Sequence, residues 1–200
     1  MKTTRLEAFS DGVIAILITI MVLELKVPQG NDWLAIRHTV FTLLMYVLSF
    51  IYLGIYWSNH HHMFHAARHV SGSVLWANLH LLFWLSLVPF MTTWMGENHF
   101  ASLPTALYGF VLLAAAVAYT ILQARIIALE GKDSPLAKAV GKDRKGKISM
   151  TLYLTALIVA FVHPLIADAI YATVAMIWLV PDRRIESQFA LDRHSDERSR

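Results

Sequence analysis

Six long apolar segments dominate this 200-residue chain and restrict the folds open to it. Hydrophobic residues make up 56% of the chain and charged residues only 16%, and the apolar residues come in long runs rather than in alternation. About 20 apolar residues form a helix that spans the hydrocarbon core of a bilayer. The runs cover 8–27, 35–57, 72–94, 105–125, 148–163 and 164–180. We therefore predict an all-α integral membrane protein, a six-helix bundle.

Lysines and arginines set the expected orientation, because cytoplasmic loops of membrane proteins carry an excess of them. With the amino terminus inside, all but two of the 17 are cytoplasmic, the exceptions being Lys26 and Arg37. Six crossings return the carboxyl terminus to the same side. We expect a membrane domain at 1–181 and a polar cytoplasmic tail at 182–200. This topology and anionic lipid at the inner leaflet explain the net charge of +3, which does not argue for nucleic acid as a partner.

Several function classes have no support in the sequence. The chain contains no cysteine, which excludes disulfides, thiolate chemistry and metal sites built on sulfur. It also has no glycine-rich loop of the kind that cradles the phosphates of a nucleotide cofactor. We expect neither an enzyme nor a bound cofactor.

The first apolar segment begins with charged residues that most membrane helices exclude. Arg5, Phe9, Ser10 and Asp11 spell R-x-x-x-F-S-D at its start. Charged groups at a bilayer boundary are costly unless they are paired or solvated, so this helix is expected to face protein and an ion route rather than lipid. The motif resembles the first helix of the transmembrane protein 175 family of potassium channels, in its single-repeat prokaryotic form.

This resemblance implies a pore. In the family the first helix lines the conduction path, and matching from Asp11 places the constriction isoleucine on Ile16, a threonine on Thr19 and further narrowings on Ile20 and Leu23. These four share one side of a helix, whereas Asp11 projects about 140° away from Ile16. The alternative interpretation is that this apolar stripe is ordinary helix packing.

Because the chain carries one copy of the motif, a pore on a symmetry axis requires several chains. The resemblance implies a homotetramer in the plasma membrane of a prokaryote, with both termini cytoplasmic and potassium as the permeant ion. The chain has no T-V-G-Y-G segment to supply a carbonyl-lined filter. Our hypothesis is that Thr19 and nearby backbone or water oxygens hold a partly dehydrated cation while the Ile16 ring sets the width, which gives modest selectivity.

Arg5 and Asp11 need partners, because burying an unpaired charge costs several kcal/mol. We expect an imidazole or indole N–H, including that of His61, to donate to Asp11, with Ser10 capping nearby backbone. Asn78 and His80 of the third segment are further possible members. The end of the second segment resembles the family's W-x-x-H-H-x-x-F pattern through Trp57, His60, His61 and Phe64.

Other functions stay open at this point. Five histidines lie between 60 and 69, and His61 and His65, four residues apart, lie on one helical face that suits a metal or haem. No nearby carboxylate completes such a site. A proton-coupled secondary transporter would use Asp11, Asp168 and the histidines as relays. Glu24, at the outer end of the first segment, would attract cations to an outer mouth or merely mark where the helix enters water.

Overall fold

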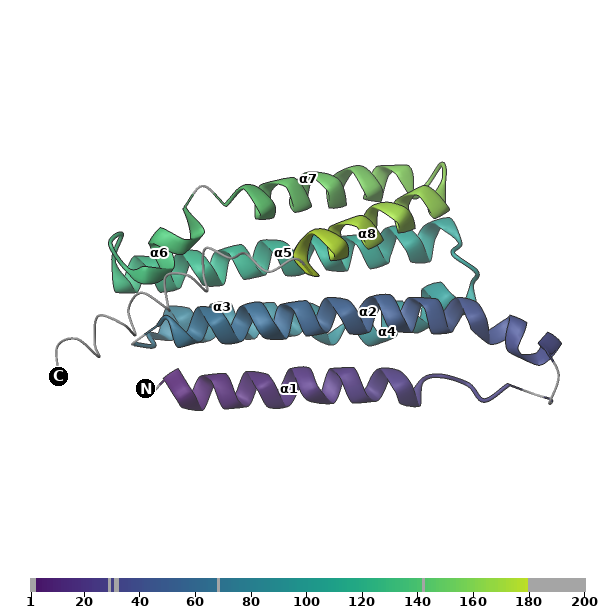
Figure 1. Ribbon diagram of the computed structural model, residues 1–200, viewed down its shortest axis with the longest axis horizontal. Helices are drawn as coiled ribbons and strands as arrows, with labels where there is room; N and C mark the ends of the chain where they lie inside the picture. The colour runs from purple at the N-terminus through teal and green to yellow at the C-terminus, as the bar shows by residue number, and fades with distance from the viewer. Residues whose placement is uncertain (1–2, 29, 31–32, 68, 142, 180–200) are drawn as a thin grey trace.

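The computed structural model describes residues 3–28, 30, 33–67, 69–141 and 143–179 (Figure 1). Across these residues the regular structure consists of eight α-helices, which confirms the all-α class. They are α1 (Thr3–Leu23), α2 (Trp33–His65), α3 (Gly72–Ser86), α4 (Val88–Glu97), α5 (Ser102–Glu130), α6 (Pro135–Val140), α7 (Arg144–Val159) and α8 (Pro164–Leu179). The predicted tail at 182–200 and the side chain of Arg37 lie outside the described residues.

The third predicted segment is divided into α3 and α4, which the sequence analysis did not anticipate. The two helices meet at Leu87, whose dihedral angles (φ −85°, ψ −14°) remain right-handed. Pro89 lies in the first turn of α4, and proline has no N–H with which to continue the hydrogen bonds of the preceding helix. The interruption is local, because Gly72–Glu97 still forms one apolar stretch long enough to cross a membrane.

The helices differ in length relative to a bilayer. Four stretches of the described chain are long and apolar enough to cross one: Thr3–Leu23, Thr39–His65, Gly72–Glu97 and Ser102–Glu130. The helices α7 and α8 have 16 residues each, about 24 Å at 1.5 Å per residue. That is shorter than the hydrocarbon core of about 30 Å. They follow each other through a short turn at 160–163 and pack together against α5.

The helices form a layered bundle with α1 along one edge and α7 and α8 on the opposite side (Figure 1). The first helix packs on α2, α3 and α4, whereas α7 and α8 pack on α5 and on each other. The start of α1 lies at the end of the bundle where α2 and α5 finish and α3 and α7 begin (Figure 1).

Buried side chains form two hydrophobic cores that α5 joins. The first includes Ile14 of α1, Leu81 of α3 and Leu122 of α5. The second lies among α2, α5, α7 and α8 and is rich in tyrosine, including Tyr52 and Tyr171. The hydroxyl of Tyr52 donates a 2.6 Å hydrogen bond to the carbonyl of Tyr171, as a buried tyrosine requires. The first helix therefore buries one face in the first core and leaves the other exposed.

Candidate functional site on the first helix

The outward face of α1 carries the stripe that the sequence analysis singled out. Ile16 is 58% exposed, Ile20 39% and Leu23 80%, and Thr19 is also exposed. Two residues before Ile16, on the opposite face, Ile14 is fully buried. An exposed row of large apolar side chains marks a contact with lipid, with another protein or with a pore. Among the described residues of one chain, no element covers this face.

Thr19 is the hydroxyl in this apolar row. Its Oγ1 donates a 2.9 Å hydrogen bond to the carbonyl of Ile16, one turn back on the same helix. The bond satisfies the hydroxyl proton locally and leaves the oxygen lone pairs able to accept. The exposed face therefore presents an oxygen ligand of the kind that an alkali cation prefers, next to the Ile16 side chain.

A buried hydrogen-bond chain fixes the other face of α1. The hydroxyl of Ser10 donates to the carbonyl of Leu6 at 2.9 Å. The amide of Asn78 on α3 donates to the Ser10 oxygen at 2.9 Å, and its carbonyl oxygen contacts Nε2 of His60 on α2 at 2.7 Å. Ser10, Asn78 and His60 are all fully buried. A satisfied buried network specifies how helices pack, so this one sets the position of α1 against α2 and α3.

The hydrogen bonds define the protonation of His60. Because Asn78 uses its N–H to donate to Ser10, its oxygen must accept, and Nε2 of His60 therefore carries the hydrogen. Nδ1 of His60 is buried and has no hydrogen-bond partner among the described residues. The ring also packs against Phe64 with centroids 4.6 Å apart. This histidine is a packing and hydrogen-bonding residue in the core of the site.

Two acidic residues of α1 hold the end of α2. The indole Nε1 of Trp57 donates a 3.0 Å hydrogen bond to Oδ1 of Asp11, which is the indole alternative of the sequence analysis. His61 contacts Glu7, with 2.7 Å between Nδ1 and Oε1. The sequence analysis proposed His61 as a partner of Asp11 and missed Glu7. The sequence did contain a signal for this pairing, because residues four apart share a helix face. Glu7 and Asp11 have this spacing on α1, and Trp57 and His61 have it on α2.

The remaining predicted members lie apart from this network. Arg5 and Phe9 are exposed on α1, and no hydrogen bond or ion pair joins them to it in the described part of the chain. His80 instead accepts a 2.9 Å hydrogen bond from the indole of Trp84 on its own helix. The motif thus divides into Ser10 and Asp11, which bind neighbouring helices, and Arg5 and Phe9, which face outward.

The histidine run does not converge on a metal site. His61 and His65 stack with ring centroids 6.0 Å apart. Within the residues that the structure describes, no group of three or more His, Cys, Asp or Glu side chains is arranged to hold a metal ion. The contacts of His60 and His61 described above are structural contacts between helices.

Charged residues also surround the other end of α1. Glu24 is exposed just beyond the last turn of the helix. Lys26 forms an ion pair with Glu97 of α4, with 2.6 Å between Nζ and Oε1. That hydrogen bond to the Glu97 carboxylate raises the pKa of the Lys26 ammonium group above its ordinary value. Glu97 is a second residue that sequence reasoning missed, since it belongs to the distant α4.

Comparison with known proteins decides the family. Residues 5–89 match the family model described as endosomal/lysosomal potassium channel TMEM175. The chain is 54% identical over 186 residues to a potassium channel of Chryseobacterium sp., which covers 93% of this chain and 97% of that protein. The chain belongs to the TMEM175 family. The matched range contains the whole α1 to α3 network described above.

Two further TMEM175 relatives extend the comparison. A potassium channel of Streptomyces collinus is 36% identical over 129 residues, which cover 60% of this chain and 63% of that protein. The crystal structure of a lysosomal potassium-selective channel TMEM175 homolog from Chamaesiphon minutus matches with a TM-score of 0.77 at 28% identity, covering 90% of this chain and 97% of that chain. TMEM175 membership and four apolar stretches long enough to cross a membrane make this a multi-pass membrane protein in a lipid environment. The family and its relatives are named as potassium channels, which are not enzymes.

Proposed function

We propose that the protein is a homotetrameric channel that passes potassium with modest selectivity through a pore lined by α1. The observation that carries the proposal is the exposed stripe of Ile16, Thr19, Ile20 and Leu23 on a helix whose other face is fixed by buried hydrogen bonds. Relatives at 54% and 36% identity are named potassium channels. A stripe that served only as lipid contact would not need a rigid polar anchor behind it.

Several copies of the chain are needed to enclose a pore. One α1 presents one face, and rotational symmetry is the common way in which identical chains repeat a face around an axis. Four copies place four stripes toward the axis, in which case the side chains that are exposed in one chain are covered in the assembly. The apolar stripe then explains the assembly and the conduction path together.

Ile16 is proposed as the constriction. A ring of large aliphatic side chains narrows a pore and gates it by expelling water. Next to it, Thr19 Oγ1 and the carbonyls of α1 supply oxygens for a cation that has lost part of its hydration shell. Potassium gives up water more readily than sodium, so a narrow ring favours potassium by a modest factor. The potassium ions pass near Ile16 and Thr19.

The proposed location is the plasma membrane of a prokaryote, with both termini cytoplasmic. Arg125, Lys132, Lys138 and Lys147 lie near the bundle end where α1 begins, whereas Lys26 lies at the opposite end. An excess of lysine and arginine marks the cytoplasmic side. The buried network of Ser10, Asn78 and His60 then lies in the inner half of the membrane.

Reversal potentials of the purified protein in a planar bilayer test the constriction. Replacing Ile16 by Asn introduces a polar ring that holds water, and we expect larger currents and a potassium-to-sodium permeability ratio closer to one. Val22→Asn is the matched control, because Val22 is 47% exposed on α1 but projects about 120° away from Ile16. Unchanged current and selectivity in I16N would reject Ile16 as the constriction.

Cysteine cross-linking tests the axis. The natural chain has no cysteine, so I20C introduces the sole thiol, and we expect it to form disulfide-linked dimers in oxidised membranes because α1 helices meet at the axis. The control is L165C on α8, where Leu165 is 68% exposed, and we expect this variant to stay monomeric. Cross-linking of L165C but not of I20C would exclude an α1-lined pore.

Slow flux that depends strictly on a proton gradient would favour the transporter alternative.

A further inference from the structure

Helix α7 lies across the bundle from α1 and carries a stripe of exposed residues with two chemically different parts (Figure 1). The exposed residues recur every three or four positions, which is the spacing of one helix face. The stripe is cationic in the first turn of the helix and apolar or hydroxyl-bearing beyond it. Its members, here called the α7 stripe, include Arg144, Lys147, Ile148, Thr151, Leu154 and Ile158.

Arg144 and Lys147 are the cations of the α7 stripe. Both are exposed in the first turn of α7, and that turn contains no acidic residue. Neither side chain forms a hydrogen bond or an ion pair within the part of the chain that the structure describes. The protein therefore presents two neighbouring positive charges at the start of this helix without a negative group to match them.

The charged neighbours of these two residues have other contacts. Asp143 caps α7, its Oδ1 accepting a 3.1 Å hydrogen bond from the Gly146 N–H. Nζ of Lys145 lies 6.0 Å from the centroid of the Trp178 ring on α8. Glu130, at the end of α5, accepts a 2.8 Å hydrogen bond from a backbone N–H between α2 and α3. Within the described chain, these groups do not neutralise the α7 stripe.

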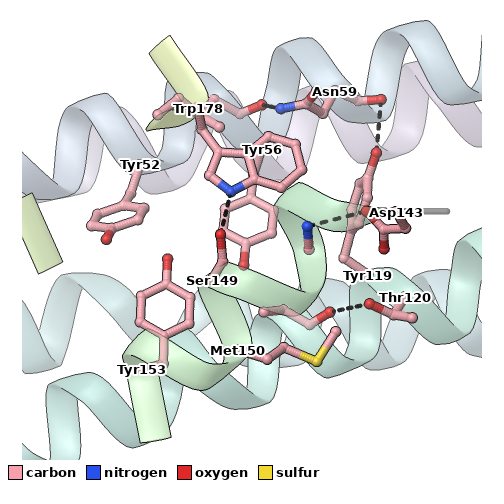
Figure 2. A pocket seen from close by; sticks show the side chains of 13 residues that line it. Tyr52, Tyr56, Asn59, Tyr119, Thr120, Asp143, Ser149, Met150, Tyr153 and Trp178 are labelled. Carbon is pink, nitrogen blue, oxygen red and sulfur yellow. Dashed lines mark hydrogen bonds between the residues drawn. The ribbon is translucent and has the colours of Figure 1, made fainter. Parts of the chain in front are cut away.

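The start of α7 lies deeper in the bundle than the end of α5 (Figure 1). Asp143 and Gly146 border the same small cavity as Tyr119 and Thr120 of α5 (Figure 2). Beyond Thr120, α5 continues through residues 121–130, and its apolar run ends at Arg125. Five residues of helix measure about 7.5 Å. The first turn of α7 is therefore about that much nearer to the membrane centre than Arg125, where hydrocarbon meets the lipid headgroups.

Cations at this depth need an anionic partner, because a charge at the edge of the hydrocarbon is costly unless it is paired or reaches water. The phosphate of a membrane lipid lies at the same depth, and guanidinium and ammonium groups both form charge-assisted hydrogen bonds with phosphate. Farther into the membrane, Ile148 is 52% exposed, Leu154 52% and Ile158 65%. These side chains offer an apolar surface to an acyl chain that continues from that phosphate.

We propose that the α7 stripe binds one anionic phospholipid of the inner leaflet. The phosphate lies at Arg144 and Lys147, and an acyl chain lies along Ile148, Leu154 and Ile158. An anionic headgroup fits better than a zwitterionic one, which brings its own cation close to the basic pair. The placement in the inner leaflet rests on the proposed function, in which α1 faces the pore axis and leaves α7 facing lipid at the periphery.

Lipid retention by the purified full chain tests the proposal. The immobilised protein in detergent is equilibrated with equal amounts of palmitoyl-oleoyl phosphatidylglycerol and phosphatidylcholine, which have the same acyl chains. Mass spectrometry then measures the lipid that remains after washing. We expect at least about fivefold more phosphatidylglycerol than phosphatidylcholine, since each basic residue near the membrane surface favours an anionic lipid by about that factor. Equal retention of the two lipids would overturn the proposal.

Two double substitutions of equal charge distinguish a site from a general attraction of anionic lipid to basic protein. R144Q with K147Q removes both cations of the α7 stripe, and we expect the lipid ratio to fall to about one. K132Q with K138Q removes two exposed lysines of the preceding loop and α6, off the stripe, and should retain the wild-type ratio. An equal fall in both double variants would contradict a site on α7. R144K with K147R keeps both charges and should behave like the wild type.

Single substitutions keep the proposal testable if the double variant does not assemble. R144Q and K147Q should each lower the lipid ratio at least about twofold, and a wild-type ratio in both would reject the site. Excess inorganic phosphate should not displace the retained lipid, because the acyl chain also holds it. Complete displacement would assign the two cations to a free anion instead of a lipid.

None of these measurements requires ion conduction. A protein that conducts potassium without a preference for phosphatidylglycerol would overturn the lipid site alone. A protein that shows the preference without conducting would overturn the proposed channel function and leave the lipid site intact.

Discussion

Asn78 on α3 donates a 2.9 Å hydrogen bond to the hydroxyl oxygen of Ser10 on α1, and both side chains are fully buried. The same amide contacts His60 on α2 at 2.7 Å. One side chain therefore links the three helices that begin the chain. Because a primary amide both donates and accepts, few other residues can bridge a hydroxyl and an imidazole N–H at once.

Replacing Asn78 by Ala should destabilise the protein. The change leaves the Nε2–H of His60 buried without an acceptor and removes a donor from Ser10, and an unsatisfied buried polar group costs about 1–3 kcal/mol. We expect a lower midpoint in thermal unfolding of the purified protein. Asn98→Ala is the control, because Asn98 is exposed and bonds to Trp94 on its own helix. Equal midpoints for the two variants would show that the amide bridge has no role in stability.

The pairing of α1 with the end of α2 is tested by double-mutant cycles. We expect Glu7 to couple with His61, and Asp11 to couple with Trp57, each by about 0.5–1 kcal/mol in unfolding free energy, because each pair shares a hydrogen bond. Asp11 and His61 should be additive, since no direct bond joins them. Unfolding in denaturant measures each cycle, and a larger coupling for Asp11 with His61 would contradict the observed contacts.

Much of the fold was accessible from the sequence because membrane helices need long apolar runs. The residues at which the helices begin and end were predicted less accurately than their existence. Helix α7 begins at Arg144, before the predicted start at 148, and α2 continues to His65 rather than stopping at Trp57. Charged and polar residues end an apolar run, but they do not end a helix that continues into the interface. Hydropathy therefore located the apolar part of these two helices and missed their polar ends.

The site was predictable to the extent that it depends on depth and helix face. Ser10, Asp11, Trp57, His60 and Asn78 lie at similar depth, so their proximity followed from topology. The hydrogen-bond partner of Asp11 could not be predicted in this way, because the rotation of each helix about its own axis decides whether Trp57 or His61 reaches it.

Gly96 on α4 should not tolerate alanine. A Cβ at this position would lie 2.5 Å from the Cα of Thr42 on α2, and a backbone atom cannot move aside without shifting a helix. We expect G96A to lose about 1–3 kcal/mol of unfolding free energy. Gly54 on α2 is the matched control, because its Cβ would meet nothing within 4 Å. There alanine should stabilise by about 0.5–1 kcal/mol through helix propensity, and chemical unfolding distinguishes the two signs.

The carboxylate of Asp168 on α8 should lower the free energy of unfolding. Both carboxylate oxygens are buried without a hydrogen-bond partner among the described residues. Asp168→Asn removes the charge while it preserves the shape, and at pH 8 we expect a gain of about 1–3 kcal/mol in unfolding free energy. D133N, which changes an exposed acid, should have little effect. A lower thermal midpoint for D168N would show that the carboxylate has a partner or a function that the proposed channel mechanism does not include.

Glu24 provides a test of the outer mouth that depends on the proposed assembly. Four exposed carboxylates around one axis raise the local cation concentration, and salt screens this effect over about 10 Å at 0.1 M. We expect E24Q to reduce single-channel potassium conductance by about twofold at 20 mM KCl and to leave it unchanged at 1 M. D133N is the control, because Asp133 is exposed in the loop between α5 and α6, at the end of the bundle opposite Glu24. A reduction that persists at 1 M KCl would assign Glu24 a structural role at the end of α1 instead of an electrostatic one.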